Sequence, residues 1–216
     1  MTRKIPTHEA TYARLCAMLL FGRLIPGQAV TIQGLADEIG GGMTPVREAI
    51  RRLSAEGALT HQGNRRISVA RLDARQLDEL RYARLAIEPR IVELAAPELD
   101  AALVARLAGI DRQLDAAIAA GDVLGYLEAN HRFHFTLYEA AGAQVLTAIA
   151  RGLWLRFGPS LRVVFQSFRA GELPDRHRDA LAAMEGGDHA GLVAAMRADI
   201  NQGIERVGAA IQAGEI

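Results

Sequence analysis

The segment TPVREAIRRL at residues 44–53 constrains the fold most strongly, because ten residues combine a helix start, an apolar stripe and three arginines. Thr44 suits the N-cap of a helix and Pro45 suits its first position. Apolar residues then repeat at helical spacing, which indicates one buried face. They are Val46, Ala49, Ile50 and Leu53. The arginines remain on the other face of this predicted helix.

A shorter helix is predicted just before it. Residues 31–40, TIQGLADEIG, open with a capping residue, Thr31, and repeat apolar residues at helical spacing. Three glycines at 40–42 then permit a tight turn into the arginine-bearing helix. Two short helices around a glycine turn predict a helix-turn-helix.

Two strands are predicted after the arginine-bearing helix, at residues 58–61 and 67–70. Between them, Gly63 and Asn64 favour a hairpin turn. Two neighbouring arginines give this hairpin a positive charge. They are Arg65 and Arg66. The pattern is that of a basic wing beside a helix-turn-helix.

The arginines of residues 44–53 are candidates for contact with double-stranded DNA. Arg47 lies near the helix N-terminus, where side chains of a groove-inserted helix reach base edges, and Arg51 follows on the same face. Arg52 is offset, toward the phosphates. The alternative is a solvated surface face without a partner. Thr44, Arg65 and Arg66 complete the predicted DNA-binding set.

Charge supports a division into two domains, residues 1–71 and 72–216. Residues 1–70 hold nine lysines and arginines against five acidic residues, whereas residues 71–216 hold 16 against 20. The neutral whole chain therefore combines a front end of net charge +4 with a remainder of −4. Half of the residues are hydrophobic, which suffices for a core in each domain.

From Leu72 onward, helical spacing predominates and glycines and prolines mark the breaks. The predicted class is mainly α, a winged helix-turn-helix followed by an antiparallel all-helical bundle of six or seven helices. The predicted helices span residues 73–96, 100–120, 122–141, 143–157, 160–170, 174–185 and 188–213.

Four polar residues of the bundle are candidate metal ligands. Asn130 and His134 are four residues apart, so an amide oxygen and an imidazole share one helical face, whereas His131 points elsewhere. Later helices add His177 and Asp199, and ligands from several helices can surround a point in a bundle core. Each also has an ordinary explanation: a hydrogen-bonded core histidine, or a solvated surface residue.

The stretch PGQAVTIQGLADEIGGGMTPVREAIRRLSAEGALT resembles the winged-helix domain of the GntR family of bacterial transcription regulators. That family usually has Ser-Arg before its Thr-Pro-Val-Arg, where this chain has Gly42 and Met43. The resemblance implies an operator-binding homodimer. It extends over nearly the whole chain.

The bundle resembles the FCD effector domain of the FadR-type branch, through ANHRFHFTLYEAAG, DRHRDALAAMEGGD and the last helix. In that branch an Asp-x-x-x-His pair and two later histidines bind a divalent metal. Carried over, the Asp falls on Asn130, and the histidines fall on His134, His177 and Asp199. The carboxylate has thus moved from the first ligand position to the last, and an amide takes the first. Two nitrogen and two oxygen ligands result. Zinc, nickel, manganese and iron(II) all remain candidates.

The resemblance also implies an arginine and a glutamate on the first bundle helix, here Arg84 and Glu88. Arg84 is the predicted anion-binding residue, because a guanidinium facing a metal suits a small carboxylate effector. The alternative is an intrahelical Arg84–Glu88 ion pair. Arg156 is a second predicted effector contact, and Trp154 is expected in the core.

These observations predict a ligand-responsive transcription regulator, a repressor released from its operator by a small organic acid, and not an enzyme. The alternative is a metal-dependent hydrolase that uses the cluster of the bundle. The hydrolase leaves the arginine-bearing helix unexplained. A structural adaptor, the third reading, would predict neither operator binding nor stabilisation by a ligand. Cys16, the one cysteine, is expected to be a small buried hydrophobe. Neither a signal peptide nor a membrane span is predicted, so a cytoplasmic location is expected.

Overall fold

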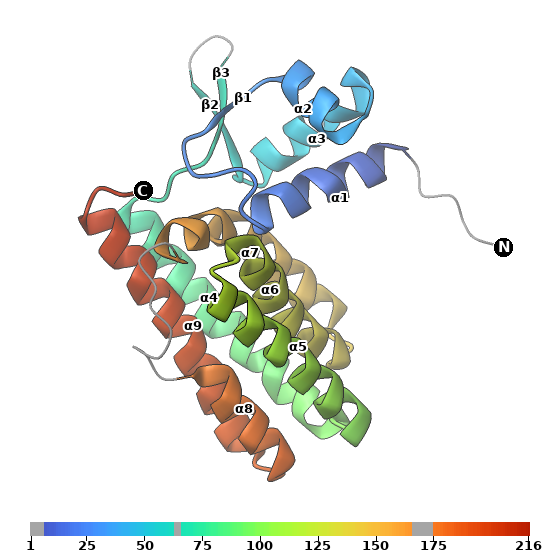
Figure 1. The fold of residues 1–216 in the computed structure, drawn as a ribbon, viewed down its shortest axis with the longest axis vertical. Helices are drawn as coiled ribbons and strands as arrows, with labels where there is room; N and C mark the ends of the chain where they lie inside the picture. The colour runs from blue at the N-terminus through green and yellow to red at the C-terminus, as the bar shows by residue number, and fades with distance from the viewer. Residues whose placement is uncertain (1–6, 63–65, 166–174) are drawn as a thin grey trace, which may run out of the picture.

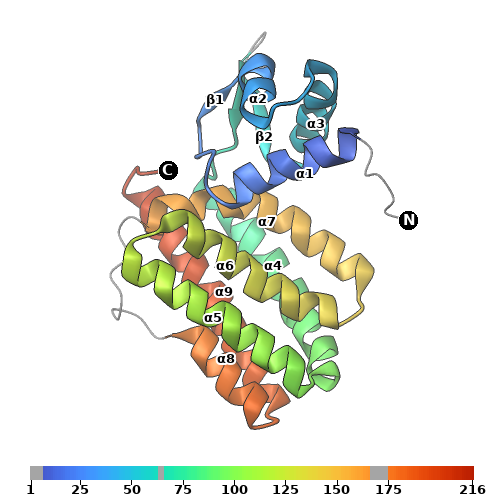
Figure 2. The ribbon, with the colours of Figure 1, turned by 45° about the vertical axis from the view of Figure 1, so that its right-hand side comes forward.

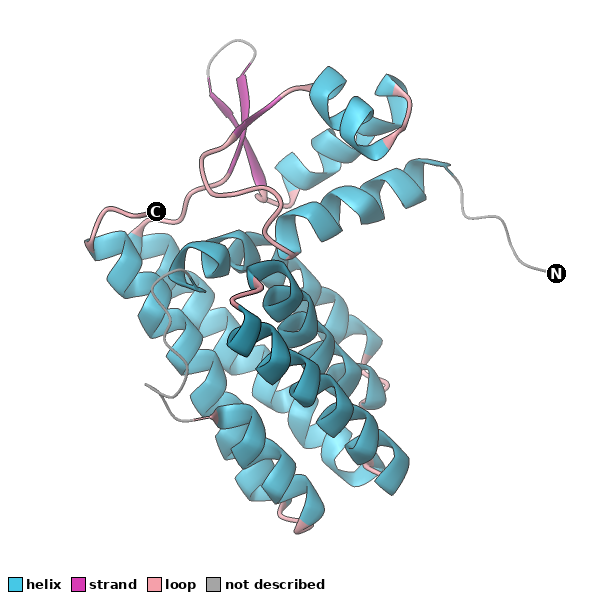
Figure 3. Cartoon of the chain, viewed as in Figure 1, coloured by secondary structure: helices cyan, strands magenta, loops and turns pink. Residues whose placement is uncertain are grey.

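The computed structural model describes residues 7–62, 66–165 and 175–216. They form a small helix-and-strand domain placed on one end of a helical bundle (Figure 1). Within the described residues, all strands lie in the upper domain (Figure 3). The predicted fold class is confirmed.

The upper domain is a winged helix-turn-helix. Its sheet is antiparallel with strand order β1-β3-β2, and Ala29 pairs with Ser68 while Leu59 pairs with Val69. The two predicted strands are present with ends shifted by one residue, whereas α1 and β1 escaped prediction. The elements are α1 (Thr7–Leu20), β1 (Ala29–Val30), α2 (Ile32–Ile39), α3 (Met43–Ala55), β2 (Leu59–Gln62) and β3 (Arg66–Val69).

Helix α2 has the predicted ends, but α3 starts earlier than predicted. The hydroxyl of Thr31 accepts a hydrogen bond from the N–H of Gly34 at 2.9 Å, and Gly40 ends α2 in the left-handed conformation at φ 60°. The N-cap of α3 is Gly42, which makes no side-chain cap bond. The expectation that Thr44 is the N-cap is therefore wrong. Pro45 is the third residue of α3, not the first as predicted, and it is tolerated because the first-turn N–H groups have no partner within the helix.

The bundle contains six α-helices and one 3₁₀ turn among the described residues. Helix α4 packs against α6, α7 and α9, and α5 packs against α6 and α8, around one continuous apolar core. The elements are α4 (Ala74–Ala95), η1 (Ala96–Glu98), α5 (Ala101–Ala120), α6 (Val123–Ala140), α7 (Gln144–Phe165), α8 (Arg176–Glu185) and α9 (His189–Gln212).

Aspartate N-caps start five of these helices. At α4, Asp73 and Gln76 form a reciprocal capping box, and at α5 the carboxylate of Asp100 accepts from the N–H of Leu103 at 2.7 Å. Asp122, Asp175 and Asp188 cap α6, α8 and α9 in the same way. Because a cap bond depends only on neighbouring residues, the sequence predicted most of these starts correctly.

Helix α7 corrects a prediction. Residues 143–157 and 160–170 were expected to form two helices separated at Gly158 and Pro159, yet one helix runs through both from Gln144 to Phe165. Both residues are buried, and a Cβ on Gly158 would lie 3.2 Å from the side chain of Leu20 in α1. Tertiary packing therefore offsets the hydrogen bond that a proline removes from a helix interior. Residues 166–170 and Pro174 lie outside the described residues.

Helix α1 connects the two domains. It packs against α3 on one side and against α7 on the other (Figure 2). Leu155 of α7 belongs to the apolar core of the winged helix together with Leu15, Leu19 and Leu53. The same α7 therefore contributes to the cores of both domains.

Of the helices in the described ranges, none combines the length and the apolar character that a membrane crossing requires.

Candidate effector pocket and DNA-recognition surface

The outer face of α3 presents the predicted base-reading arginine. Val46, Ala49, Ile50 and Leu53 are buried, as predicted, and Arg47 is exposed on the opposite face. Thr44 is also exposed, in the first turn of α3. Arg51 is exposed too and forms a 3.4 Å ion pair with Glu48.

Arg52 points back toward the protein. Its Nε donates to Glu56 at 2.9 Å, and its guanidinium lies 3.7 Å from the ring centroid of Tyr12. The Tyr12 hydroxyl donates to the same carboxylate at 2.6 Å. Arg52 is thus held at the junction of α1 and α3. In the wing, Arg66 is exposed at the start of β3, and Gly63, Asn64 and Arg65 lie outside the described residues.

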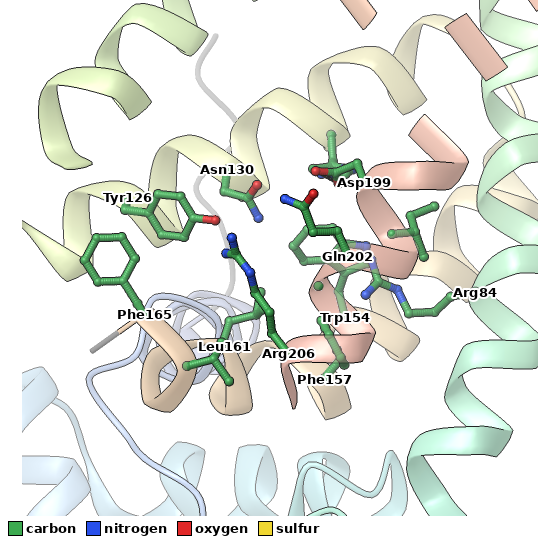
Figure 4. Close-up of a pocket in the computed structure, with 14 residues that line it drawn as sticks. Arg84, Tyr126, Asn130, Trp154, Phe157, Leu161, Phe165, Asp199, Gln202 and Arg206 are labelled. Atoms are coloured by element: carbon green, nitrogen blue, oxygen red, sulfur yellow. Dashed lines mark ion pairs between the residues drawn. The ribbon is translucent and has the colours of Figure 1, made fainter. Parts of the chain in front are cut away.

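The bundle encloses a polar pocket between α4, α6, α7 and α9 (Figure 4). The cavity is small, about 50 Å³, and both apolar and polar side chains line it. Its polar lining consists of Arg84, Tyr126, Asn130, His134, Asp199, Gln202 and Arg206. The pocket therefore combines candidate metal ligands with two arginines.

Three of the four predicted metal ligands meet in space. His134 of α6, His177 of α8 and Asp199 of α9 each offer a ligand atom, and these atoms all lie within 4.8 Å of one another. His134 Nε2 lies 3.0 Å from Asp199 Oδ2, and His177 Nε2 lies 3.7 Å from Asp199 Oδ1. The fourth, Asn130, is buried and lines the same pocket one turn before His134.

Hydrogen bonds on its far side orient His134. The Tyr138 hydroxyl donates to Glu88 at 2.7 Å, so its oxygen can accept from His134 Nδ1, which lies 3.1 Å away. A cation at Nε2 would leave the proton of the neutral imidazole on Nδ1, facing that hydroxyl, whereas without a cation Nε2 lies at hydrogen-bond distance from Asp199, 3.0 Å. Partners of this kind orient metal-binding histidines in general.

His177 is held by a different carboxylate. Its Nδ1 lies 3.4 Å from Asp111 Oδ1, and its ring stacks on Phe133 with centroids 4.1 Å apart. Its Nε2 is buried and, among the described residues, has no hydrogen-bond partner. A buried nitrogen without a partner, beside a carboxylate and a second imidazole, fits a bound divalent cation.

A metal site of this kind needs two neutral imidazoles and one carboxylate. The pKa shifts favour the required state of His134 and Asp199 but not that of His177. Burial lowers the pKa of His134 below its ordinary value, which favours the neutral ring. Although burial acts against ionisation, the hydrogen bond and charge of His134 lower the pKa of Asp199 to about 2. Burial also opposes protonation of His177, yet Asp111 and Asp199 raise its pKa. A cation at this point would replace that proton.

The Arg84–Glu88 pair is present, and it is buried rather than solvated. Arg84 Nε donates to Glu88 at 2.5 Å and Nη2 donates at 3.1 Å, with the two side chains 3% and 0% exposed. Trp154 Nε1 donates to the same carboxylate at 3.0 Å. The guanidinium also lies 4.4 Å from the ring centroid of Phe157. Arg84 is thus fixed at the pocket wall by Glu88, whose carboxylate accepts four hydrogen bonds in all.

Arg156 lies outside the pocket, which corrects the expectation that it contacts the effector. Its Nε donates to the carbonyl oxygen of Glu56, at the end of α3, at 2.7 Å. The reason is helical phase: Trp154 and Phe157 face the pocket, so the residues between them face the winged helix.

Several pocket residues escaped the sequence prediction. Tyr126 lies four residues before Asn130, and Gln202 and Arg206 lie three and seven residues after Asp199. That spacing places them on the faces of the predicted ligands, so helical periodicity could have found them. Nothing in the sequence singled out Asp111, because its partner His177 is 66 positions away.

A winged helix-turn-helix with exposed arginines, joined to a helical bundle with an internal polar pocket, defines a DNA-binding transcription regulator. Two family matches agree with this class: the bacterial regulatory proteins of the gntR family over residues 7–69, and the FCD domain over residues 79–202. The chain belongs to the GntR family, in the FadR-type branch that carries an FCD domain. FCD domains often bind a metal.

Individual relatives are regulators as well, not enzymes. The chain is 30% identical over 176 residues to the HTH-type transcriptional regulator McbR of Escherichia coli K12, which covers 80% of each chain. It is 28% identical over 160 residues to the Nta operon transcriptional regulator of Aminobacter aminovorans, covering 73% of this chain and 75% of the relative.

Solved structures share the fold over almost the full length. The E. coli McbR/YncC structure superposes with a TM-score of 0.85 at 27% identity and covers 94% of this chain and 97% of that one. A GntR regulator from Rhodococcus sp. RHA1 gives a TM-score of 0.75 at 20% identity, with 93% and 96% covered.

Proposed function

We propose that this regulator is a homodimeric repressor that binds operator DNA and releases it when the bundle binds a small organic acid beside a divalent metal. One observation carries the proposal: a single turn of α7 contacts both the pocket and the DNA-binding domain. The geometry supports the proposal at three places, the metal cluster, the pocket wall and the junction.

At the cluster, His134, His177 and Asp199 would hold the metal, with Asn130 as a fourth ligand. Two nitrogens and two oxygens suit manganese and iron(II) as well as zinc and nickel. A bound divalent cation supplies a positive centre that can coordinate a carboxylate oxygen. The unpartnered Nε2 of His177 supports this assignment.

At the pocket wall, Arg84 would bind the acid. Glu88 holds the guanidinium in place, so no ordering of a long side chain is needed when the acid arrives. The cavity of about 50 Å³ favours a ligand of a few heavy atoms. Gln202 and Arg206 line the opposite side and would contribute to its recognition (Figure 4).

At the junction, α7 would transmit occupancy of the pocket to the DNA-binding domain. Trp154 and Phe157 line the pocket, whereas Leu155 packs into the winged-helix core and Arg156 bonds to the end of α3. Since a helix moves as a unit, a shift of the pocket wall displaces the contact with α3. An acid that binds one arrangement of the domains more tightly then shifts DNA affinity.

The homodimer is supported by exposed apolar side chains on two helices that pack together, α4 and α7. Tyr82 of α4 is 81% exposed, and Val145 and Ile149 of α7 are 75% and 45% exposed. Large apolar side chains that are exposed in one copy are candidates for burial against another. A second copy would remove them from water and place two winged helices on one operator.

The test is fluorescence anisotropy on labelled DNA from the region upstream of the protein's own gene. The protein is purified without chelator, and acetate, lactate, malonate and citrate serve as probes of increasing size and charge. We expect one of them to weaken specific DNA binding in a metal-dependent manner. The variant with His134→Ala and His177→Ala should bind the same DNA, contain less metal by elemental analysis, and lose the response.

Two outcomes would contradict the proposal. If the wild type and the double variant contain the same substoichiometric metal, the cluster does not bind it. If the acids weaken DNA binding equally in both proteins, the pocket does not transmit the signal through a metal.

A further inference from the structure

A second cavity lies at the junction of the two domains, apart from the metal cluster. It is a cleft of about 530 Å³ between α1 on one side and α6 and α7 on the other, in the region where α1 crosses α7 (Figure 2). The pocket of the bundle measures about 50 Å³. The larger cleft falls in the size range of small-molecule sites in proteins.

Small residues on the facing helices account for the open space. Ala13 and Ala17 of α1 face Ala148 and Gly152 of α7 across the cleft. A Cβ added to Gly152 would meet no other atom within 4 Å. Bulkier side chains at these positions would fill the space between the two helices, so the small residues leave the cleft open.

The interior of the cleft is apolar and aromatic. Leu20, Phe21 and Leu155 line it, and His131 stacks on Phe135 with ring centroids 4.3 Å apart. The edge of Phe21 contacts the same imidazole at 5.6 Å. These flat surfaces favour a planar aromatic occupant, which stacks or packs edge-on against rings.

Two guanidinium groups mark the rims. Arg52 lies over Tyr12 at one rim and Arg151 lies over Phe135 at the other, at 3.7 Å and 4.8 Å from the ring centroids. Glu56 accepts from Arg52, and Glu139 accepts from Arg151. Each of these bonds uses one of the five donors of a guanidinium, and both side chains are about half exposed. Donors therefore remain for a ligand at each rim.

We propose that the junction cleft is a second small-molecule site, which takes an aromatic acid with one negative charge. Arg52 and Arg151 keep unused donors beside their glutamate partners, so a single anionic group can bind at a rim while the aromatic body of the ligand covers the apolar interior. The occupant touches Arg52 on the recognition helix and α7 on the bundle. It therefore fixes one arrangement of the domains, independently of the metal cluster.

Two dyes of matched shape test the charge and the apolar body separately. The probe 8-anilinonaphthalene-1-sulfonate carries one negative charge, and N-phenyl-1-naphthylamine has the same rings without it. We expect both to bind in the cleft and the sulfonate to bind more tightly. Arg151→Gln should reduce that preference, because it removes one guanidinium from the rim.

The single cysteine of the chain reports where the dyes bind. Cys16 lines the cleft and is half-buried, so its alkylation by iodoacetamide follows occupancy without interference from other thiols. At a dye concentration ten times the dissociation constant, we expect alkylation to slow roughly tenfold by mass action. Far-ultraviolet circular dichroism checks that the dyes leave the fold intact.

Gly152→Leu is designed to fill the cleft. The position has room for a side chain, and leucine is a better helix former than glycine, so the variant should fold at least as well as the wild type. It should abolish the protection of Cys16 by both dyes. Gly109→Leu, inside α5 and outside the lining of the cleft, is the matched control and should keep it.

Three results would overturn the proposal. Dyes that bind without protecting Cys16 occupy another surface. Equal protection in the wild type and in Gly152→Leu places the dyes elsewhere near the thiol. A thiol that is inert at high protein concentration and reactive on dilution shows that a second copy of the chain covers the cleft.

Discussion

Arg156 and Glu56 are 100 positions apart in the sequence, and the Nε of the arginine donates to the backbone carbonyl of the glutamate at 2.7 Å. The guanidinium also lies against Gly57, whose φ of +77° and missing Cβ leave room for it. The side chain of Glu56 binds Tyr12 and Arg52 at the same time. The end of the recognition helix is thereby tied to α1 and to α7.

We therefore expect Arg156→Ala to loosen the winged helix from the bundle. Losing one charge-assisted hydrogen bond at an exposed site should lower the stability of the upper domain by about 1 kcal/mol. Differential scanning calorimetry should show an earlier or separate transition for that domain. Arg75→Ala, which removes an exposed ion pair within α4, is the control. If the two variants melt alike, the contact does not couple the domains.

Arg47→Ala should weaken binding to the specific operator by about 1 to 3 kcal/mol and relax its sequence preference, because Arg47 is exposed near the N-terminus of α3. Arg66→Ala in the wing should instead weaken all DNA sequences alike and flatten the salt dependence. Anisotropy titrations on operator and random DNA over a range of salt distinguish the two effects. Equal losses of affinity for operator and random DNA would mean that Arg47 does not read bases.

The exchanged ligands at positions 130 and 199 give the prediction most particular to this sequence. Asn130→Asp should hold or raise metal affinity and weaken the binding of an anionic effector, because the site gains a negative charge. Asp199→His leaves no carboxylate among the four ligands and should lose affinity for manganese. Together the two substitutions should recover tight zinc or nickel binding.

Manganese and zinc titrations of the wild type, the two single variants and the double variant test this exchange. Wild-type Asp199 lies 3.0 Å from His134, so a substitution there acts directly on a second ligand. Strictly additive effects of the two substitutions would mean that residues 130 and 199 do not share a metal.

Asp111 should tune the metal site without contacting the metal. Its Oδ1 lies 3.4 Å from His177 Nδ1, which favours a proton on Nδ1 and leaves Nε2 on the side of Asp199. Asp111→Leu should lower cobalt affinity by about 10- to 100-fold and change the visible spectrum of the bound cobalt. Asp111→Asn retains an acceptor oxygen and should rescue much of the affinity. If leucine and asparagine behave alike, Asp111 has a packing role only.

His131 should make the metal-free protein sensitive to mild acid. Burial lowers the pKa of His131 to about 3, so the unfolded chain takes up a proton near pH 6.5 and the folded chain does not. The stability that this residue contributes is complete above about pH 6.5 and is lost as the pH falls toward 3. His134 acts in the same direction, whereas His177, whose pKa is raised, opposes it.

Chelator-treated protein unfolded in urea at pH 7 and pH 5 measures this effect. In His131→Phe, which keeps a ring beside Phe135, the loss of stability between the two pH values should be smaller than in the wild type. The same substitution at the exposed His189 of α9 is the control. An unchanged pH dependence in His131→Phe would assign the acid sensitivity to other groups.

Local signals made much of the fold predictable. The aspartates at 73, 100, 122 and 188 mark helix starts because a cap bond joins residues three apart. The apolar stripe and the arginines predicted helix α3, but its first residue was not predicted correctly. Helix α1 went unpredicted, because its apolar residues face two partners, α3 and α7, and show no single stripe.

The candidate site divides in the same way. Asn130 and His134 share a helix face by spacing alone, whereas the meeting of His134, His177 and Asp199 depends on how α6, α8 and α9 pack. Helix α7 runs through Pro159 because burial against α1 offsets a lost hydrogen bond, and its phase turns Arg156 away from the pocket. The aspartate caps, the apolar stripe of α3 and the types of ligand could be predicted, since they depend on neighbouring residues. Which side chains meet follows from the packing of the helices, because contacts between distant segments form when the helices bury their apolar faces together.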